Sequence, residues 1–268
     1  MQEDHHHPMR RVVFYFKRSL FLLKNRPLPG AAALLLFTAA IHLWAFSWTP
    51  YISRDAVQYI NVAARWAEKG SYDLFAFPPL PCFCMKLLIQ LGLSPDCAGK
   101  VYCFTTGIFV PLAAYMLILR ATSNRRLARY SAIMLTVHPL LLQFSVEPLR
   151  DGAFLLLALL AMNCGLAGLK KQKLLPWLSA SIFTAAAWCC RFEALELTAL
   201  AFIALTVGTV KKQYPFLKAA GHFLLYFLCG LLFWILLTAA TGGKESFKAQ
   251  YDNYILNKWD LLVKKWKV

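Results

Sequence analysis

Long runs of apolar residues, separated by short polar stretches, make up most of this 268-residue chain. Seven runs are each long enough, or nearly so, to cross about 30 Å of hydrocarbon as a helix. They are residues 31–48, 101–119, 131–146, 152–169, 174–190, 194–210 and 216–241. Because backbone groups in lipid must be hydrogen-bonded within their own segment, each run predicts a helix. The pattern therefore predicts an all-α, polytopic membrane bundle of about seven transmembrane helices.

The segment 49–93 does not fit a spanning helix. Ser53 is suited to cap an amphipathic helix that ends at Gly70 and buries Val57 together with Ile60, Ala64 and Ala67. The proline-rich stretch 77–81 predicts extended chain, followed by an apolar helix over 82–93 that is too short to cross. We expect this segment to form an external loop whose helices lie in the membrane interface.

The tail 242–268 has a second amphipathic pattern, with aromatic residues and lysines alternating at helical spacing. We expect it to lie in the plane of the interface as well. The chain is thus divided into a basic N-terminal segment over 1–27, a membrane module over 28–241 and an amphipathic tail over 242–268.

Composition supports the membrane class, because 59% of the residues are hydrophobic and the mean hydropathy is +0.51. The net charge of +16 is distributed over every second connection between runs. The basic positions are Arg10, Arg11, Lys17, Arg18, Lys24, Arg26, Arg120, Arg125, Arg126, Arg129, Lys170, Lys171, Lys173, Lys211, Lys212 and Lys218. Alternation of this kind follows the positive-inside rule and places the N-terminus in the cytoplasm, and 49–93 and the tail outside. A nucleic-acid surface would instead be one contiguous basic patch.

Ionisable residues also stand at the external ends of the apolar runs. They are Asp55, Glu147, Arg150, Asp151, Arg191 and Glu193. A charge costs roughly 2.5–3.5 kcal/mol at the centre of a membrane helix, so charged groups near the apolar zone indicate functional sites. The sequence therefore predicts chemistry on the non-cytoplasmic side.

Asp55 lies in the first turn of the external helix, beside Arg54. Its simplest role is to stabilise the helix dipole, which is worth a few tenths of a kcal/mol to about 1 kcal/mol. The alternative is catalytic, since an ionised carboxylate held at the membrane surface can accept a proton from an incoming hydroxyl.

The connections 147–151 and 191–196 admit two interpretations as well. A local salt bridge, a helix start capped by Asp151 and an exposed pair of Arg191 with Glu193 or Glu196 would be structural. Glu196, one turn inside an apolar run, and Glu147, at the very end of another, favour a functional cleft in which Arg150 and Arg191 meet carboxylates or a phosphate.

The order of these motifs carries a family resemblance. The motifs are Arg-Asp-Ala-x-x-Tyr-Ile at 54–60, Phe-Pro-Pro-Leu-Pro at 77–81, His-Pro at 138–139, Glu-Pro-Leu-Arg-Asp at 147–151, and Trp188 followed by Arg-Phe-Glu-Ala-Leu-Glu at 191–196. Over residues 30–240 the chain resembles the N-terminal membrane module of the bacterial family 39 glycosyltransferases. Their GT-C fold is shared with protein O-mannosyltransferases and the lipid A aminoarabinose transferase.

The resemblance implies a membrane enzyme that moves a sugar from a polyprenyl-phosphate donor to a lipid, glycan or protein acceptor outside the bacterial cytoplasmic membrane. Asp55 would be the catalytic base, and Glu147, Arg150, Asp151 and Arg191 would line the donor site. In the displacement that fits this chemistry, Arg150 and Arg191 bind the leaving phosphate, assisted by Lys244 or Lys248. Arg54, Tyr59, Glu193 and Glu196 complete the predicted site.

We expect no cofactor and no nucleic-acid partner. Ala56 stands where many relatives carry a second acid, which removes support for a metal site, and Cys82 and Cys84 lack the companions of a zinc site. Two other functions remain open from the residues alone. One is a small transporter or flippase, although no half-repeat accompanies the acids. The other is a non-catalytic membrane scaffold with the same fold.

Overall fold

The computed structural model describes residues 27–48, 53–70 and 78–240, and within these ranges every regular element is a helix. The basic N-terminal segment up to residue 26, the tail, Lys244 and Lys248 lie outside the described residues. The helices are α2 Pro27–Trp48, α3 Arg54–Lys69, α4 Pro79–Gln90, α5 Pro95–Thr122, α6 Arg125–Thr136, α7 Pro139–Val146, α8 Arg150–Lys171, α9 Leu174–Trp188, α10 Leu195–Val210 and α11 Phe216–Ala240, with a 3-10 turn, η1, at Phe192–Ala194. The predicted all-α, polytopic membrane bundle is confirmed.

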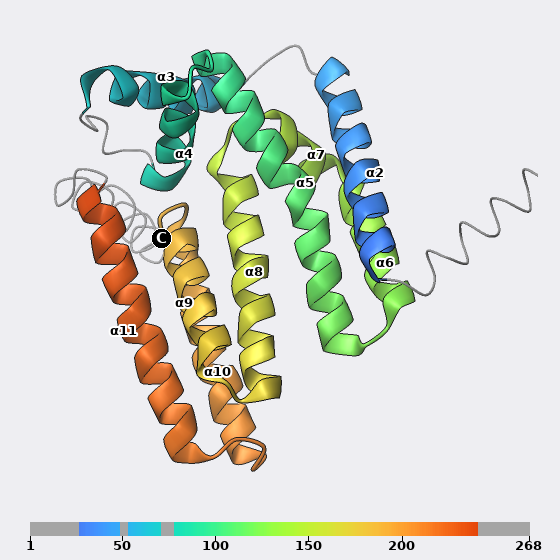
Figure 1. The fold of residues 1–268 in the computed structure, drawn as a ribbon, viewed down its shortest axis with the longest axis vertical. Helices are drawn as coiled ribbons and strands as arrows, with labels where there is room; N and C mark the ends of the chain where they lie inside the picture. Colours follow the sequence, from blue (N-terminus) through green and yellow to red (C-terminus); the bar gives the residue numbers. More distant parts are fainter. Residues whose placement is uncertain (1–26, 49–52, 71–77, 241–268) are drawn as a thin grey trace, which may run out of the picture.

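Four helices are long and apolar enough to cross a membrane: α2, α5, α8 and α11. The helices α9 and α10 fall on two further predicted runs but are shorter, with 15 and 16 residues. In the arrangement shown in Figure 1, α6, α5, α8, α9 and α11 follow one another across the molecule, and α2 covers α5, α6 and α7. The helix α10 packs against α8, α9 and α11.

The third predicted span, 131–146, is not one helix, so this prediction was wrong. Pro139 restricts His138 to an extended conformation and begins the short helix α7, while α6 ends at Thr136. A buried polar contact lies at this break: Thr136 is fully buried, and its hydroxyl lies 3.0 Å from the Thr38 hydroxyl of α2. Apolar composition alone had concealed this interruption.

The helix α3 begins and ends where the sequence predicted. The Ser53 side chain accepts a hydrogen bond from the Ala56 N–H, and Gly70 adopts the left-handed conformation, with φ of 72°. The predicted buried face was right in part: Ile60 is buried and Ala64 and Ala67 are partly buried, but Val57 is 42% exposed. The centre of the buried face lies toward the neighbouring positions Ala56, Tyr59, Ala63 and Trp66. The helix α3 packs against other helices of the protein, and the face that it buries there carries Tyr59 and Trp66.

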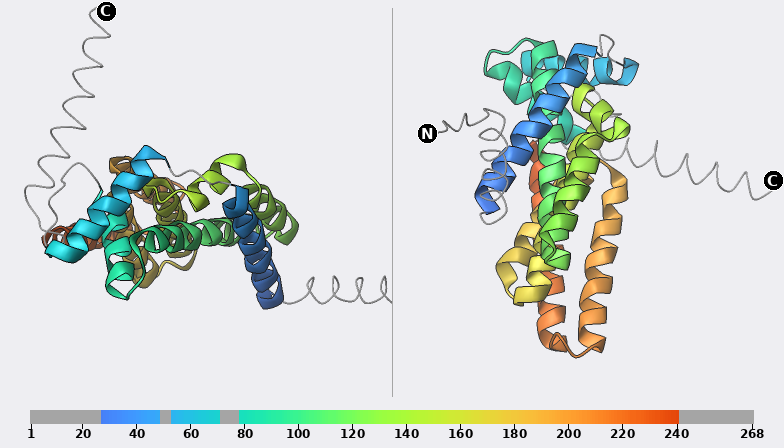
Figure 2. Two further views of the ribbon diagram at one scale, coloured as in Figure 1. Left: turned by 90° about the horizontal axis from the view of Figure 1, so that it is seen from above. Right: turned by 90° about the vertical axis from the view of Figure 1, so that its right-hand side faces the viewer.

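The stretch 77–81 was predicted to be extended, which holds for Pro78 but not for 79–81, while residue 77 lies outside the described residues. Pro79 starts α4, because proline at the first helical position lacks only an N–H that would have no partner there. The helices α3 and α4 lie together across one end of the bundle, as Figure 2 shows. Their buried side chains share one hydrophobic cluster with Tyr102 of α5, Ala153 of α8 and Cys190. We call this end of the bundle the α3 end.

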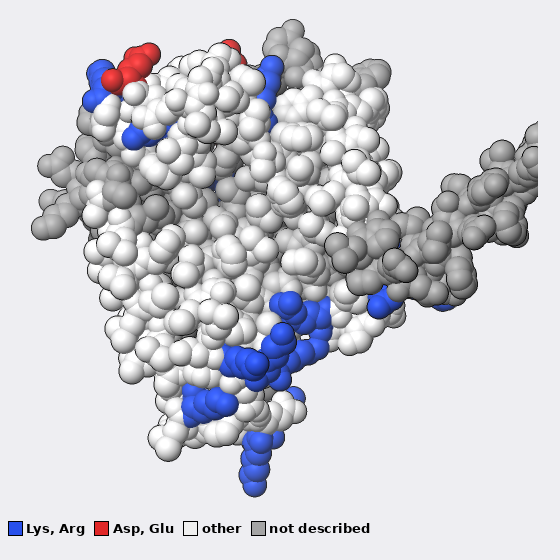
Figure 3. Space-filling view, viewed as in Figure 1, with Lys and Arg blue, Asp and Glu red and all other residues white. Residues whose placement is uncertain are grey.

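Charge divides the two ends of the bundle. The α3 end carries seven carboxylates and seven cations among the described residues: Asp55, Glu68, Asp96, Glu147, Asp151, Glu193 and Glu196, with Arg54, Arg65, Lys69, Lys86, Lys100, Arg150 and Arg191. The opposite end, which we call the basic end, carries ten cations and no described carboxylate: Arg120, Arg125, Arg126, Arg129, Lys170, Lys171, Lys173, Lys211, Lys212 and Lys218. On the face in Figure 3, red atoms occur only at the α3 end and blue atoms gather at the other.

Candidate functional site

Three segments far apart in the sequence meet at the α3 end. They are the first turns of α3, the link between α7 and α8, and the turn between α9 and α10. Tyr59 joins them, because its side chain is 5% exposed and packs in the cluster that includes Leu149 and Cys190. Tyr102 of α5 donates a hydrogen bond from its hydroxyl to the Leu149 carbonyl at 3.4 Å, which holds the second segment in place.

The electrostatic surroundings of Tyr59 identify its neighbours. Burial raises the pKa of the Tyr59 hydroxyl, the positive charge of Arg150 opposes this shift, and the charge of Asp151 adds to it. The tyrosine hydroxyl therefore stays neutral at physiological pH and lies within electrostatic range of the first two residues of α8.

Arg191 is the centre of an ion-pair network. Its Nη1 donates to Asp151 Oδ1, its Nη2 donates to Glu193 Oε1 at 3.0 Å, and its Nε donates to Glu193 Oε2 at 3.3 Å. The guanidinium carbon also lies 5.6 Å from the centre of the Phe154 ring. The hydrogen bonds to Glu193, with the charge of Asp151, raise the pKa of Arg191 against the opposing effect of burial. The network ties the α9–α10 turn to the start of α8.

Partial burial distinguishes this network from an exposed surface pair. The side chains of Arg191, Asp151 and Glu193 are 28%, 22% and 32% exposed. Water therefore reaches all three side chains, but the surrounding protein covers most of the surface of each. All three guanidinium nitrogens of Arg191 donate to carboxylates, and a phosphate that binds side-on through Nε and Nη2 would have to displace Glu193.

Glu147, four positions before Asp151 in the sequence, provides a second polar centre. It ends α7, is 9% exposed, and accepts a hydrogen bond on Oε1 from Gln143 Nε2 at 3.3 Å. Its Oε2 is buried with no hydrogen-bond partner among the described residues. A buried carboxylate oxygen without a donor is costly, so this atom is suited to accept a hydrogen bond from a bound hydroxyl.

Asp55 and Arg54 lie exposed in the first turn of α3. The Asp55 carboxylate has no hydrogen bond or ion pair to the part of the chain that the structure describes. Since Asp55 and Tyr59 are four positions apart, they share one face of α3. The structure thus places an accessible carboxylate one helical turn from Tyr59, which packs in the hydrophobic cluster that the other two segments share.

Glu196 differs from its predicted environment. Because α10 starts at Leu195, Glu196 lies in the first turn of this helix, where its side chain is exposed. Of the two predicted partners of Arg191, Glu193 is paired with it and Glu196 is not, and Asp151 is the second carboxylate that the structure brings to Arg191. Asp151 does not cap α8 with its side chain either, since Leu149 is the N-cap residue and makes no side-chain bond.

Two members of the site were not selected from the sequence. Gln143 precedes Glu147 by four positions, and Phe154 follows Asp151 by three, so each shares a helix face with a selected residue. Helical spacing around the selected carboxylates was the available signal. In the described part of the chain, no group of three His, Cys, Asp or Glu residues is arranged to hold a metal ion.

Comparison with known proteins assigns the family. Residues 77–234, more than half of the chain, match the family model described as dolichyl-phosphate-mannose-protein mannosyltransferase. The chain belongs to this family. It is accordingly an integral membrane glycosyltransferase of the GT-C type, and the family implies a lipid-linked sugar as donor. No curated protein and no solved structure matches the chain.

The family match covers the two segments that contain Glu147, Asp151 and Arg191, as well as most of α11. It begins after α3, so the position of Asp55 in the site rests on the packing of Tyr59 and on the shared helix face.

Proposed function

We propose that this family member transfers a sugar from a polyprenyl-phosphate carrier to the hydroxyl of a lipid, glycan or protein acceptor at the outer face of a bacterial cytoplasmic membrane. The observation that supports this most strongly is the meeting of three segments at the α3 end, where a partly buried network joins Arg191 to Asp151 and Glu193 and the exposed Asp55 lies one helical turn from Tyr59. This combination suits a reaction between a lipid phosphate and a polar acceptor.

In the proposed reaction, the acceptor oxygen attacks the anomeric carbon while the Asp55 carboxylate takes the hydroxyl proton. A new bond forms between that oxygen and the anomeric carbon, and the bond from the anomeric carbon to the phosphate oxygen breaks. The polyprenyl phosphate leaves with the bonding electron pair. Because Asp55 is exposed and has no partner among the described residues, an acceptor can approach it without displacing any of them.

The leaving phosphate requires positive charge, and we assign this role to Arg150 and Arg191. Arginine matches phosphate with two parallel hydrogen bonds, and incoming phosphate would exchange with Glu193 on the guanidinium of Arg191. The buried Glu147 Oε2 would accept a hydroxyl of the transferred sugar. Lys244 and Lys248, which lie outside the described residues, remain proposed contributors to phosphate binding. No metal or other cofactor enters the proposed reaction.

The proposed orientation in the membrane rests on how charge is distributed between the two ends of the bundle. Ten cations at the basic end, with no carboxylate beside them among the described residues, favour its retention in the cytoplasm. The α3 end, where the described cations and carboxylates are equal in number, would then face the non-cytoplasmic side together with Asp55.

A transfer assay with an Asp55→Asn variant tests the proposal. Membranes containing the protein are supplied with a panel of labelled polyprenyl-phosphate hexoses and pentoses, and label is counted in lipid, glycan and protein fractions. We expect transfer from at least one donor, and a loss of roughly 10²–10⁴-fold in the variant, as is usual when a general base is removed.

The chain offers a matched control for this assay. Asp96 also lies exposed in a first helical turn, after a Ser94 that caps α5 as Ser53 caps α3. Asp96→Asn removes the same helix-start charge without touching the site and should transfer at the wild-type rate. Equal rates for Asp55→Asn and Asp96→Asn would return Asp55 to a structural role.

A further inference from the structure

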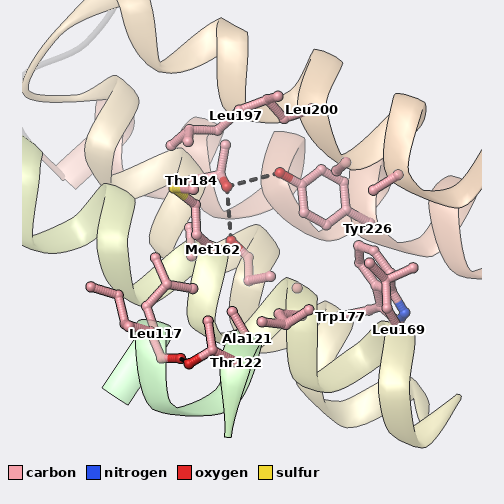
Figure 4. A pocket seen from close by; sticks show the side chains of 17 residues that line it. Leu117, Ala121, Thr122, Met162, Leu169, Trp177, Thr184, Leu197, Leu200 and Tyr226 are labelled. Atoms are coloured by element: carbon pink, nitrogen blue, oxygen red, sulfur yellow. Dashed lines mark hydrogen bonds between the residues drawn. The ribbon is translucent and has the colours of Figure 1, made fainter. Parts of the chain in front are cut away.

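An apolar groove lies among α5, α8, α9, α10 and α11. It has a volume of about 490 Å³ and is lined from five helices, by residues that include Leu117, Met162, Leu200, Thr184 and Tyr226. Figure 4 shows Thr184 and Tyr226 bonded to each other inside it. The Tyr226 hydroxyl donates to Thr184 at 2.8 Å, and Thr184 donates to the Ala180 carbonyl at 2.9 Å. With these hydroxyls satisfied, the groove wall is suited to hydrocarbon.

A second, polar pocket continues this groove at the basic end. It has a volume of about 590 Å³ and shares three lining residues with the groove, namely Leu166, Leu169 and Ala204. Its other walls carry Lys170 at the end of α8 and Lys211 just after α10. Hydrocarbon and cationic surface therefore meet in one continuous depression, with Leu166 and Ala204 at the junction.

Local hydrogen bonds hold the two lysine-bearing segments in position. The Gln172 side-chain amide donates to the Gln213 carbonyl at 2.8 Å, which ties the end of α8 to the turn after α10. The Lys170 ammonium group donates to the Arg120 carbonyl at the end of α5. This pocket is thus fixed on both sides and carries two positive charges, and no described carboxylate lies at this end of the bundle.

We propose that this depression is a binding site for one anionic phospholipid of the leaflet that the basic end faces. The lipid phosphate lies between Lys170 and Lys211, and one acyl chain passes Leu166 and Ala204 into the groove. Charge complementarity selects an anionic headgroup, and the continuity of the two pockets selects a ligand with a phosphate and a long chain. A small soluble anion would leave the groove unused. The donor phosphate of the proposed reaction belongs to the opposite end of the molecule.

Lipid titration of the purified protein tests the site without any assay of sugar transfer. The protein in detergent is titrated with phosphatidylglycerol or with phosphatidylcholine, and bound lipids are counted by native mass spectrometry. We expect one phosphatidylglycerol to bind more tightly than the others and more tightly than phosphatidylcholine. Because each surface lysine adds about 1 kcal/mol to the binding of anionic lipid, the pair Lys170→Gln with Lys211→Gln should weaken this first affinity about 25-fold.

The same end of the bundle supplies a control with equal charge change. Lys171 and Lys173 are exposed and line neither pocket. The pair Lys171→Gln with Lys173→Gln should therefore retain the first affinity. Lys211→Gln alone, which disturbs no side-chain hydrogen bond to the described residues, should weaken it about fivefold even if the Lys170 substitution alters folding. Ala204→Leu, which fills the junction of the two pockets, should also weaken it.

Three results would overturn the proposal. One is equal loss of affinity in the two lysine pairs, which would mean attraction of lipid by the whole basic end. Another is equal binding of phosphatidylcholine and phosphatidylglycerol. The third is unchanged phosphatidylglycerol affinity in Ala204→Leu, which would place the lipid chain outside the groove.

Discussion

The two ends of this bundle carry charge in opposite ways. At the α3 end, seven carboxylates accompany seven cations among the described residues, and Arg191 is joined to Asp151, 40 positions away in the sequence. At the basic end, ten cations stand with no described carboxylate beside them. Paired charges depend on close contacts that fix side chains in place, whereas unpaired charges act through their sum. The first arrangement suits chemistry, and the second suits orientation in a membrane and attraction of anionic lipid.

The substitution Arg191→Lys should have the largest effect that distinguishes the two ends. Lysine keeps the positive charge but cannot donate to Asp151 and to both oxygens of Glu193 in one plane. If Arg191 stabilises the leaving phosphate, we expect transfer to fall roughly 10²-fold in a folded protein. Arg65→Lys, an exposed position on α3, is the control and should transfer normally. Normal transfer by Arg191→Lys would make the network purely structural.

The substitution Gly168→Ala should disturb packing near the basic end instead. A Cβ at position 168 would lie 2.6 Å from Trp177 Nε1, and Trp177 is fully buried with little room to move. We expect a loss of about 1–3 kcal/mol in stability, measured by thermal unfolding in detergent, with transfer per folded molecule unchanged. Gly221→Ala, whose Cβ would meet nothing within 4 Å, should leave stability the same or raise it. Equal melting temperatures for both variants would contradict the close contact at Gly168.

The substitution Ser53→Ala should have the smallest effect and should be confined to α3. It removes the hydrogen bond that the Ala56 N–H donates to the serine hydroxyl, which costs about 1 kcal/mol. Hydrogen exchange should accelerate in α3 and remain unchanged in α8 and α9. In Ser94→Ala, exchange in α3 should remain at its wild-type rate, because Ser94 caps α5. Acceleration throughout the bundle would mean that α3 does not open independently.

The sequence predicted the helical class and several helix ends well, because apolar length and caps act locally. Ser53 and Gly70 bounded α3 as expected. It did not predict the break at Pro139, because the apolar residues on both sides resemble one continuous span. The buried face of α3 was assigned as if lipid were its partner, but α4, α5 and α8 bury the face with Tyr59 and Trp66. Interhelical partners depend on distant residues that a local pattern does not contain.

The candidate site shows the same limit. Charged residues at the ends of apolar runs could be selected one by one, since their cost in lipid marks them. Their pairing could not, because the sequence offered Arg191 the nearby Glu193 and Glu196, whereas its pairing with Asp151 depends on how the α9–α10 turn packs against the start of α8. The roles of Asp55, Arg150 and Glu147 in transfer remain predictions.

The central claim is that the α3 end faces the non-cytoplasmic side and the basic end faces the cytoplasm, and a native cysteine tests it directly. Cys97 is exposed in the first turn of α5, at the α3 end. A membrane-impermeant maleimide should label Cys97 in intact cells, with the signal absent in Cys97→Ser. In that variant background, Lys173→Cys at the basic end should be labelled only after permeabilisation. Labelling of Lys173→Cys in intact cells, with Cys97 protected until permeabilisation, would contradict the account.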